Sequence, residues 1–319
     1  MVFICTKYSD CISVYDSDTF EELEFHSFNI DDNERYINQI LYPPVVEFEM
    51  ILIIFYNKTL KKTELITFDY INNNIINIIY VDFMYIFAKF SPDGNYLLIK
   101  SEDELIINKY YPNGIVSIDE QTIFEYPTKF FINDFIITND NYVLFHNKNK
   151  KIYKLNILTL ELEDLINDVE KFNIFNFSHN FNKLIIAGYT WGYESSYIEI
   201  FNYDNLIKIY DWDSESYSIE CVDISETMPI FAYTGNEDVV IVNYENENSK
   251  LILENQKLIG TIKFDNNSNK LFIMCDGTIK IFNIINIETL DVEEILEFTD
   301  TNIDNQYIEF SPLESLQLW

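Results

Sequence analysis

Histidines and cysteines are the residues with which this chain could most readily bind a metal or carry out nucleophilic chemistry. It has three histidines and four cysteines, spread along its whole length: His26, His146, His179, Cys5, Cys11, Cys221 and Cys275. None of them has the CxxC or HxxxH spacing that marks a zinc site. We therefore expect structural or exposed histidines, cysteines that act as small buried apolar residues, and no metal site.

Carboxylates are the other candidates for chemistry, and the chain has 53 of them. One acidic run, residues 211–215, begins like a calcium loop, but it lacks the glycine at the sixth position and has Val222 in place of the bidentate Glu. The seven glycines form no phosphate-binding loop, and neither a GxSxG elbow nor a kinase motif set occurs. With so many carboxylates, any one pair is expected by chance. The sequence thus predicts a protein that is not an enzyme and needs no cofactor.

The balance of acidic and basic residues indicates which classes of partner the protein could bind. Against 53 acidic residues stand only 21 basic ones, which gives a net charge of −32, and Arg35 is the single arginine. Nucleic acids and anionic membranes are bound by fields of Arg and Lys, so neither is an expected partner. An acidic surface attracts basic partners, or it serves solubility alone.

The chain shows no sign of a membrane span or a secretory signal. No stretch approaches the ~18 apolar residues that a membrane span needs. Lys7 and Asp10 interrupt any apolar run at the N-terminus that a signal peptide would require. We expect an intracellular, cytoplasmic protein, with the nucleus or a virion as alternatives.

The elements that would position functional residues are clearest in residues 85–108, which read as three short antiparallel strands. The first turn, Ser91-Pro92-Asp93-Gly94, is specified chemically, because proline presets φ and Asp-Gly supplies a positive φ. Alignment on the apolar residue that closes the first strand, Phe90, finds equivalents along the chain at Tyr42, Ile137, Phe177, Ile224, Phe264 and Phe310. The period is roughly 40 to 48 residues, as expected for a four-stranded propeller blade.

Seven units follow from this alignment. Six are continuous, at residues 36–80, 85–126, 130–167, 172–212, 216–254 and 258–298. The seventh would be shared between residues 1–28, with three strands, and residues 303–319, with one. Pairing the two ends closes a ring and removes open sheet edges. Either residues 315–319 are then a tail, or the N-terminal assignment slips by one strand.

The sequence therefore predicts an all-β protein with a single domain, residues 1–319, folded as a seven-bladed β-propeller of four-stranded blades. A helical repeat array is the alternative, because its repeats have a similar length. It would need apolar spacing of i, i+3, i+4 over ten or more residues. Only residues 155–169 come near that pattern.

The repeated sequence pattern resembles that of the WD40-repeat family over essentially the whole chain. In that family a turn Asp precedes a third strand ending in a Trp-Asp-like pair. The matching stretches here are residues 9–16, SDCISVYD, and residues 276–283, DGTIKIFN, with Asp103 and Asp238 at the same turn in two other units. Tyr or Phe replaces Trp, and the Gly-His pair is missing. The composition, rich in Asn, Ile, Tyr and Lys, resembles that of large DNA viruses or of A/T-rich eukaryotes.

The resemblance implies a partner-binding face formed by the hairpins between second and third strands. The longest, residues 188–197, carries aromatic residues, which are common anchors at interfaces; the alternative is that Trp191 folds back over its own blade. Lysines on the same face suggest patterned charge, or simply solvated loops. The expected partner-binding residues are Tyr189, Trp191, Tyr193, Tyr197, Lys58, Lys62, Lys148 and Lys151.

We thus expect a non-catalytic scaffold or adaptor of WD40 type that binds a protein or peptide, as a monomer or within a hetero-complex. One alternative is an acidic adaptor for basic partners such as histone tails. Another is a propeller hydrolase or lyase with carboxylates in its channel. Phosphoinositide-binding propellers resemble this architecture but carry a paired-Arg motif, which Arg35 alone cannot supply.

Overall fold

The computed structural model describes residues 2–7, 11–16, 19, 21–28, 35–44, 50–57, 59, 61–81, 87–101, 104–111, 116–125, 135–147, 151–167, 172–190, 195–214, 219–235, 238–254, 259–265, 267, 269–275, 278–299 and 303–310. These residues form strands arranged in seven four-stranded antiparallel sheets, and no helix. The helical-array alternative is therefore wrong. Residues 155–169, its best support, contain the end of one strand, a turn and the next strand. None of the described segments is a helix that could cross a membrane.

Six sheets follow one another along the chain, and we call them blades 1 to 6. Blade 1 consists of β4 (Arg35–Leu41), β5 (Met50–Asn57), β6 (Lys62–Asp69) and β7 (Asn74–Val81). Blade 2 consists of β8 (Phe87–Phe90), β9 (Tyr96–Lys100), β10 (Glu104–Tyr110) and β11 (Val116–Glu125). Blade 3 consists of β12 (Phe135–Ile137), β13 (Tyr142–Asn147), β14 (Lys151–Asn156) and β15 (Leu162–Ile166).

The second half of the ring repeats this order. Blade 4 consists of β16 (Phe172–Ser178), β17 (Lys183–Thr190), β18 (Ser195–Asn202) and β19 (Ile207–Ser214). Blade 5 consists of β20 (Ile219–Ile224), β21 (Ile230–Gly235), β22 (Asp238–Asn243) and β23 (Asn248–Leu253). Blade 6 consists of β24 (Ile259–Phe264), β25 (Lys270–Cys275), β26 (Thr278–Asn286) and β27 (Asp291–Thr299).

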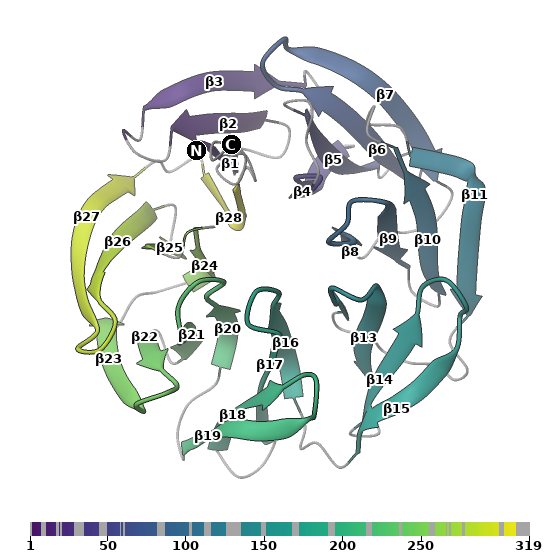
Figure 1. The fold of residues 1–319 in the computed structure, drawn as a ribbon. Helices are drawn as coiled ribbons and strands as arrows, with labels where there is room; N and C mark the ends of the chain where they lie inside the picture. The colour runs from purple at the N-terminus through teal and green to yellow at the C-terminus, as the bar shows by residue number, and fades with distance from the viewer. Residues whose placement is uncertain are drawn as a thin grey trace, which may run out of the picture.

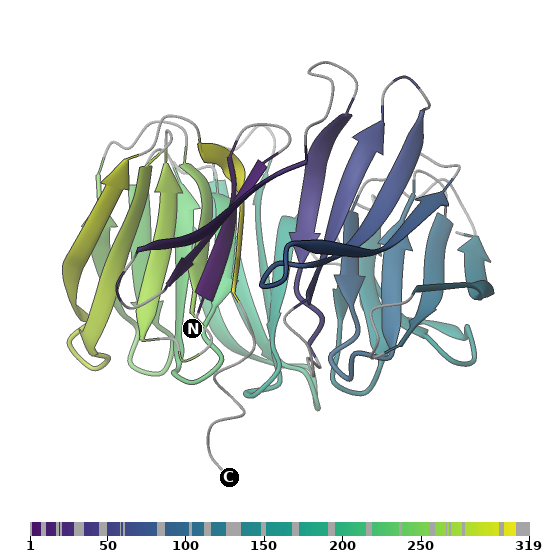
Figure 2. The ribbon, with the colours of Figure 1, turned by 90° about the horizontal axis from the view of Figure 1, so that it is seen from above.

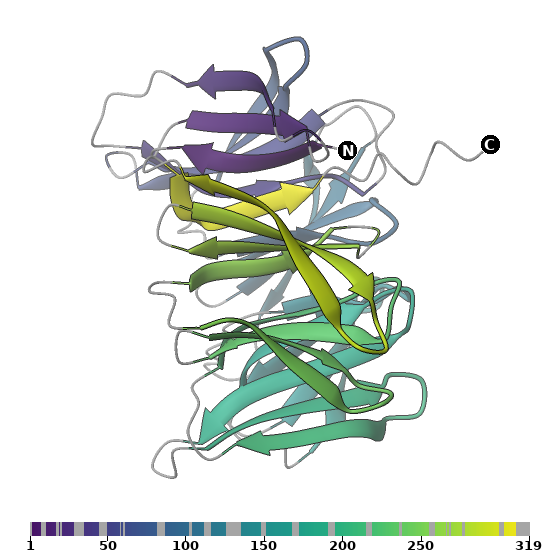
Figure 3. The ribbon, with the colours of Figure 1, turned by 90° about the vertical axis from the view of Figure 1, so that its left-hand side faces the viewer.

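Blade 7 combines the two ends of the chain. Its order is β28 (Ile303–Phe310), β1 (Val2–Lys7), β2 (Cys11–Asp16) and β3 (Glu22–Ser27). β1 pairs antiparallel with β28 (Figure 3). In this pairing Ile4 lies opposite Glu309. The N-terminal strand thus occupies the second place of the blade, and the assignment does not slip; residues 315–319 lie outside the described part.

The first strand of each blade lies nearest the ring axis and the fourth lies at the rim (Figure 1). Each innermost strand contacts the innermost strands of both neighbouring blades, including β28 between β24 and β4. The strands run between two opposite faces of the ring (Figure 2). The predicted architecture, a seven-bladed β-propeller, is confirmed.

The hydrophobic cores lie between facing blades, because each sheet has apolar residues on both sides. The cluster between blades 4 and 5 contains Ile185 and Ile198 together with Phe231 and Val242. The same arrangement joins blade 7 to blade 1, where Ile12 and Val14 meet residues of β5 and β6. Since both faces are covered, the middle strands are continuous apolar runs without polar alternation. This explains the short runs of Ile, Val, Leu and Phe that marked the repeats.

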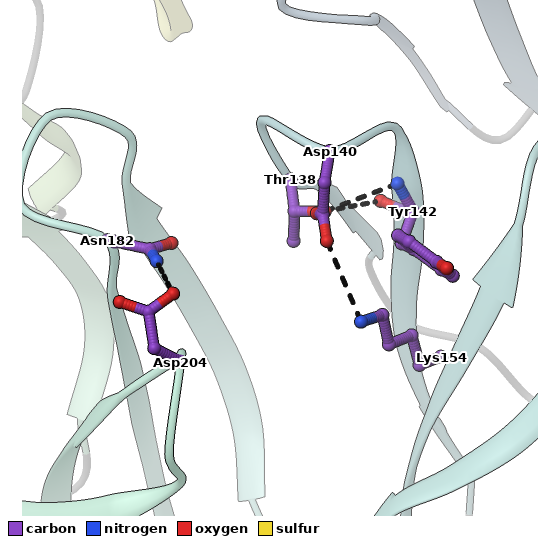
Figure 4. Close-up of polar contacts among 6 residues, drawn as sticks. All are labelled: Thr138, Asp140, Tyr142, Lys154, Asn182 and Asp204. Atoms are coloured by element: carbon purple, nitrogen blue, oxygen red, sulfur yellow. Dashed lines mark hydrogen bonds and ion pairs between the residues drawn. The ribbon is translucent and has the colours of Figure 1, made fainter.

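In blades 2 to 6 the turn after the innermost strand is built around a hydroxyl or carboxylate side chain. In blade 2 the Ser91 hydroxyl donates to Asp93 Oδ1 at 2.6 Å and accepts from the Tyr96 amide at 2.9 Å. Gly94 has a φ of 71°, as the sequence predicted for this turn. Thr138 makes the same contacts with Asp140 and Tyr142 in blade 3 (Figure 4). Here Asn141 takes the positive-φ position that glycine occupies in blade 2.

Neighbouring blades also meet through Lys154 of blade 3, whose contact with Asp140 of the same blade is drawn in Figure 4. Its Nζ lies 3.8 Å from the centroid of the Tyr142 ring, 5.2 Å from that of Tyr203 in blade 4, and 3.7 Å from Asp140 Oδ2. Burial acts to lower the pKa of Lys154, but its contacts with Tyr203 and Asp140 outweigh this and raise it. The ammonium group therefore stays charged and joins the two blades by cation–π attraction.

Deleting residues 303–319 should abolish cooperative unfolding, because blade 7 would lose its inner strand and β1 would become an open edge. The measurement is thermal unfolding followed by circular dichroism, with gel filtration to detect aggregation. Deleting residues 311–319 alone leaves β28 in place and is the control. A variant without residues 303–319 that unfolds cooperatively at the wild-type temperature would contradict closure by β28.

Candidate functional site

The predicted aromatic hairpin lies in blade 4, and most of it is strand. β17 and β18 pair as far as Thr190 opposite Ser195, so only residues 191–194 form the tip of the expected ten-residue loop. Trp191 and Tyr193, together with the side chain of Tyr189, lie outside the described part of the structure. Tyr197 was expected to be an exposed anchor, but it is only 7% exposed, packed between blades 3 and 4. Its side chain belongs to the core because it faces blade 3.

The expected lysines are only partly described. Lys62 starts β6 and is half-buried, while Lys151 starts β14 and forms an ion pair with Asp164 of the adjacent strand in its own blade. Lys58 and Lys148 lie outside the described residues. The charge of Lys151 is therefore already balanced within blade 3.

The cysteines and histidines agree with their expected structural role where they are described. Cys11 and Cys275 are buried. His26 is buried too; its ring lies edge-on to Phe68 at 4.9 Å, and its Nδ1 is 3.2 Å from Asn73 Oδ1. No group of three or more possible metal ligands occurs among the described residues. Residues 211–214 of the acidic run, which the sequence argued against as a calcium loop, belong to strand β19.

A central cavity opens on the face opposite to the predicted hairpins. Its volume is about 700 Å³, and it is lined by the ends of the first strands of blades 1 to 6 and the turns that follow them. Its polar lining comprises three amides, three basic residues and three carboxylates: Gln39, Asn139, Asn176, Lys89, His179, Lys263, Asp223, Glu226 and Asp265. A cavity of this size suits a small ligand or a peptide side chain.

Gln39 joins the innermost strands of blades 1 and 2. Its Nε2 donates to the Ala88 carbonyl at 3.0 Å, and its Oε1 accepts from the Ala88 amide at 2.9 Å. Ala88 is fully buried, so these two backbone groups have no access to water. The glutamine amide replaces the missing sheet pairing between the two blades, as buried backbone groups require.

Asp223 joins three innermost strands at once. Its Oδ1 accepts from Asn176 Nδ2 of β16 at 2.8 Å, and its Oδ2 accepts from the Phe264 amide of β24 at 2.7 Å. Burial raises the pKa of Asp223 to about 6, although the Phe264 hydrogen bond and nearby Lys263 act to lower it. A carboxyl whose oxygens are both engaged between strands acts as a brace.

Glu226 connects the first turns of blades 4 and 5 in a similar way. Its Oε1 accepts from the His179 amide at 3.1 Å, and its Oε2 accepts from the Asn180 amide at 2.9 Å and the Ser178 hydroxyl at 3.2 Å. Burial lowers the pKa of His179; Glu226 opposes this effect and Lys89 adds to it. The imidazole is therefore neutral near pH 7, with its Nδ1 2.8 Å from Asn139 Oδ1.

These contacts form part of a hydrogen-bonded chain between the first turns of blades 2 to 6, which we call the turn belt. Asn141 Nδ2 donates to Asp93 Oδ2 at 2.9 Å, and Asn139 Nδ2 donates to the His179 carbonyl at 2.6 Å. Beyond Glu226, the Thr227 hydroxyl donates to the Asn267 carbonyl at 2.7 Å. Burial acts to raise the pKa of Asp93, but its hydrogen bonds from Ser91, Asn95 and Asn141 hold it below the usual value.

This arrangement limits what chemistry the cavity can perform. A catalytic carboxylate pair needs at least one oxygen that can reach the substrate's proton. Asp223 and Glu226 instead accept hydrogen bonds from neighbouring strands and turns. Lys89 lies near two aromatic rings, with its Nζ 5.5 Å from the Phe87 centroid and 5.8 Å from the Phe135 centroid. Gln39, Asp223 and Glu226 thus link neighbouring blades.

This cavity was not predicted from the sequence, although the repeat alignment contains a signal for it. In most units the residue directly before the aligned apolar residue is polar, although an inner strand would otherwise be apolar. These polar residues are Lys89, Asn176, Asp223, Lys263 and Glu309. A polar position that recurs on the innermost strand predicts a polar channel, because alternate residues of that strand point toward the ring axis.

Comparison with known proteins identifies the architecture. No family profile matches the sequence, and no curated protein matches it. Hsv2 of Kluyveromyces lactis has a similar structure, with a TM-score of 0.65 and 10% identity over 91% of this chain and 93% of that one. A Lactobacillus plantarum protein aligns over 95% of this chain and 98% of its own, with a TM-score of 0.67 and 8% identity.

The chain is a seven-bladed β-propeller. Hydrazine synthase of Kuenenia stuttgartiensis also aligns, with 11% identity over 80% of this chain and 78% of that one and a TM-score of 0.59. At such identities the likeness is one of fold alone. No sequence match supports membership of the WD40 family, so that resemblance rests on the repeat pattern.

Replacing Gln39 with Ala should lower the free energy of unfolding by about 1–3 kcal/mol, because the buried amide and carbonyl of Ala88 would lose their partners. Urea denaturation measures the change. Asn72→Ala, which removes an exposed amide bonded within its own turn, is the matched control. Equal losses in the two variants would show that Gln39 does not bridge the blades.

Asp223→Asn should remove a pH-dependent part of the stability. Because the native state holds the Asp223 proton with a pKa of about 6, above the usual 3.8, this carboxyl stabilises the fold most at low pH and loses that contribution as pH rises through 6. The unfolding free energy of the wild type relative to Asp223→Asn should therefore fall by about 1.4 kcal/mol between about pH 5 and pH 7.5.

Denaturation between about pH 5 and pH 7.5 measures the effect. This range lies above the isoelectric point of 4.2, the pH at which the protein is least soluble. The hydrogen bond lost in the variant adds only a constant offset. Asp204→Asn, which changes an exposed carboxylate bonded to Asn182 (Figure 4), is the control. A difference between the wild type and Asp223→Asn that stays flat with pH would mean that Asp223 is not desolvated.

Proposed function

We propose that this propeller is a non-catalytic scaffold that binds a protein or peptide through the hairpin face of blade 4. One observation carries this proposal: Asp223 and Glu226, two of the carboxylates in the cavity, accept hydrogen bonds between neighbouring blades. Their role as braces favours a rigid platform over a catalytic centre. Continuous contact between innermost strands supports the same interpretation.

The binding site of this proposal is the tip at residues 191–194, with Trp191 and Tyr193 as anchors. The paired strands β17 and β18 extend to this tip, so they would present it on a firm base. Aromatic side chains dominate the energy of many interfaces, and a preformed hairpin loses little entropy on binding. The net charge of −32 would steer basic segments toward the ring.

The acidic adaptor for basic partners is the second candidate. It is favoured by the outer strand of blade 6, where Glu293, Glu294 and Glu297 are exposed on β27. An adaptor of this kind would bind through many weak charge contacts, which salt screens. The scaffold proposal instead rests on two aromatic residues, so the two candidates differ in their response to salt and to mutation.

Affinity capture followed by mass spectrometry tests the proposal, with wild type and Trp191→Ala/Tyr193→Ala compared at low and high salt. A stoichiometric partner should be captured by the wild type and lost in the double variant at both salt concentrations. Leu23→Ala/Phe25→Ala, which removes two half-exposed apolar side chains from β3, is the matched control and should keep the partner.

Other outcomes would overturn the proposal. Basic partners that disappear at high salt whatever the mutation would favour the acidic adaptor. If no stoichiometric partner is found, the hydrolase or lyase alternative would return, and turnover that is lost in Asp223→Asn and Glu226→Gln would establish it.

A further inference from the structure

The fourth strand of each blade is the edge of its sheet and exposes unpaired backbone groups. Charged residues, which disfavour pairing with another strand, occur in the sequences of six of these seven strands. They are Glu22 and Glu24 in β3, Asp119, Glu120 and Glu125 in β11, Glu163 and Asp164 in β15, Lys208, Asp211 and Asp213 in β19, Lys250 in β23, and Asp291, Glu293, Glu294 and Glu297 in β27. β7 is the exception. Its sequence, NIINIIYV, contains no charged residue.

The side chains of β7 are also unusually exposed for apolar residues. Ile75, Ile76 and Ile78 are between 39% and 44% exposed, and Tyr80 is 53% exposed. Only Ile79 is buried, in the cluster between blades 1 and 2. A β-branched, uncharged edge strand of this kind is a known template for pairing with a further strand.

The shape of this edge determines where a further strand can pair. The register between the third and fourth strands of blade 1 shifts once, between Thr67 and Phe68. Beyond this bulge, the pairs from Thr67 opposite Asn77 to Thr63 opposite Val81 are regular. Residues 77–81 therefore offer a straight edge, with Ile78 and Tyr80 on the same side of the strand.

We propose that a second copy of this chain pairs with β7, strand against strand, to form a two-fold dimer. In a two-fold contact each surface meets itself, so the acidic outer strands would place carboxylates against carboxylates. β23 carries only Lys250, which would face its own copy, so β7 alone among the outer strands brings no like charges together, in a chain whose net charge is −32. A basic partner would instead be drawn to the acidic outer strands. The uncharged strand β7 then remains available to a second copy of this chain.

Antiparallel pairing about Ile79 would place Ile78 opposite Tyr80 of the second copy, and Tyr80 opposite Ile78. Such pairs of an aromatic and a β-branched residue stabilise antiparallel strands. A single strand pair is a small interface, so the dimer would form only at high protein concentration. The inference goes beyond the scaffold function, because a dimer would present two copies of each binding face.

Sedimentation equilibrium over a range of protein concentrations tests this inference with the full chain. Dimers should form, and they should form more strongly at about 0.5 M than at about 0.05 M salt, because salt screens the repulsion between acidic copies. Ile78→Glu should raise the dissociation constant at least about tenfold. Leu251→Glu, at a residue 42% exposed on β23, adds the same charge to another edge and should leave the dissociation constant unchanged.

A mixture of variants tests the register and guards against misfolding. Ile78→Glu and Tyr80→Lys should each dimerise weakly alone, while a mixture of the two should regain dimers through the new Glu–Lys pair. Matching circular dichroism spectra for all variants would show that they are folded. A wild type that stays monomeric at every concentration and salt, a dimer that Ile78→Glu leaves intact, or equal losses with Leu251→Glu would each overturn the inference.

Discussion

Each sheet in this protein has two apolar faces and can cover neither of them by itself. A blade such as β16–β19 buries one face against blade 3 and the other against blade 5, so its core residues lie in two separate clusters. The stability of every blade thus depends on both neighbours, and a chain of blades becomes stable only when its ends meet. The pairing of β28 with β1 meets that requirement, and His26 and Phe68 pack together where blade 7 meets blade 1.

The centre of the ring presents the opposite problem. Innermost strands converge there, and their inward-facing backbone groups have no sheet partner. Polar side chains supply the missing hydrogen bonds at Ala88 and Phe264, through Gln39 and Asp223. The cost of burying a carboxyl appears in the raised pKa of Asp223. Part of the polar lining of the cavity therefore has a structural role.

At the rim, charged residues protect the unpaired backbone groups of the outer strands, as hydrogen bonds from side chains do for the innermost strands at the centre. The outer strands are open edges, and acidic side chains keep most of them from joining other sheets. An excess of carboxylates is well suited to this task, since an acidic edge repels the equivalent edge of another copy. This makes the uncharged sequence of β7 informative, because it departs from a rule that the other six outer strands follow.

The sequence alone determined the architecture. Seven repeats of apolar runs, with polar turns at constant spacing, specify four-stranded sheets, because the two-residue period of a strand and the chemistry of turns such as 91–94 are local properties. The unit boundaries agree with the blades to within a few residues. Local signals also placed Gly94 at a positive φ and identified Cys11 and Cys275 as core residues.

Tertiary structure decided the positions of the functional side chains. Tyr197 looked like part of an exposed loop, but whether a residue of a paired hairpin faces solvent or the next blade depends on the neighbouring sheet, which the sequence does not specify. The bridges made by Gln39, Asp223 and Glu226 likewise join residues about 40 to 50 positions apart, a separation equal to one blade. Contacts between blades arise only when the sheets pack side by side, so the cavity and the turn belt are properties of the assembled propeller.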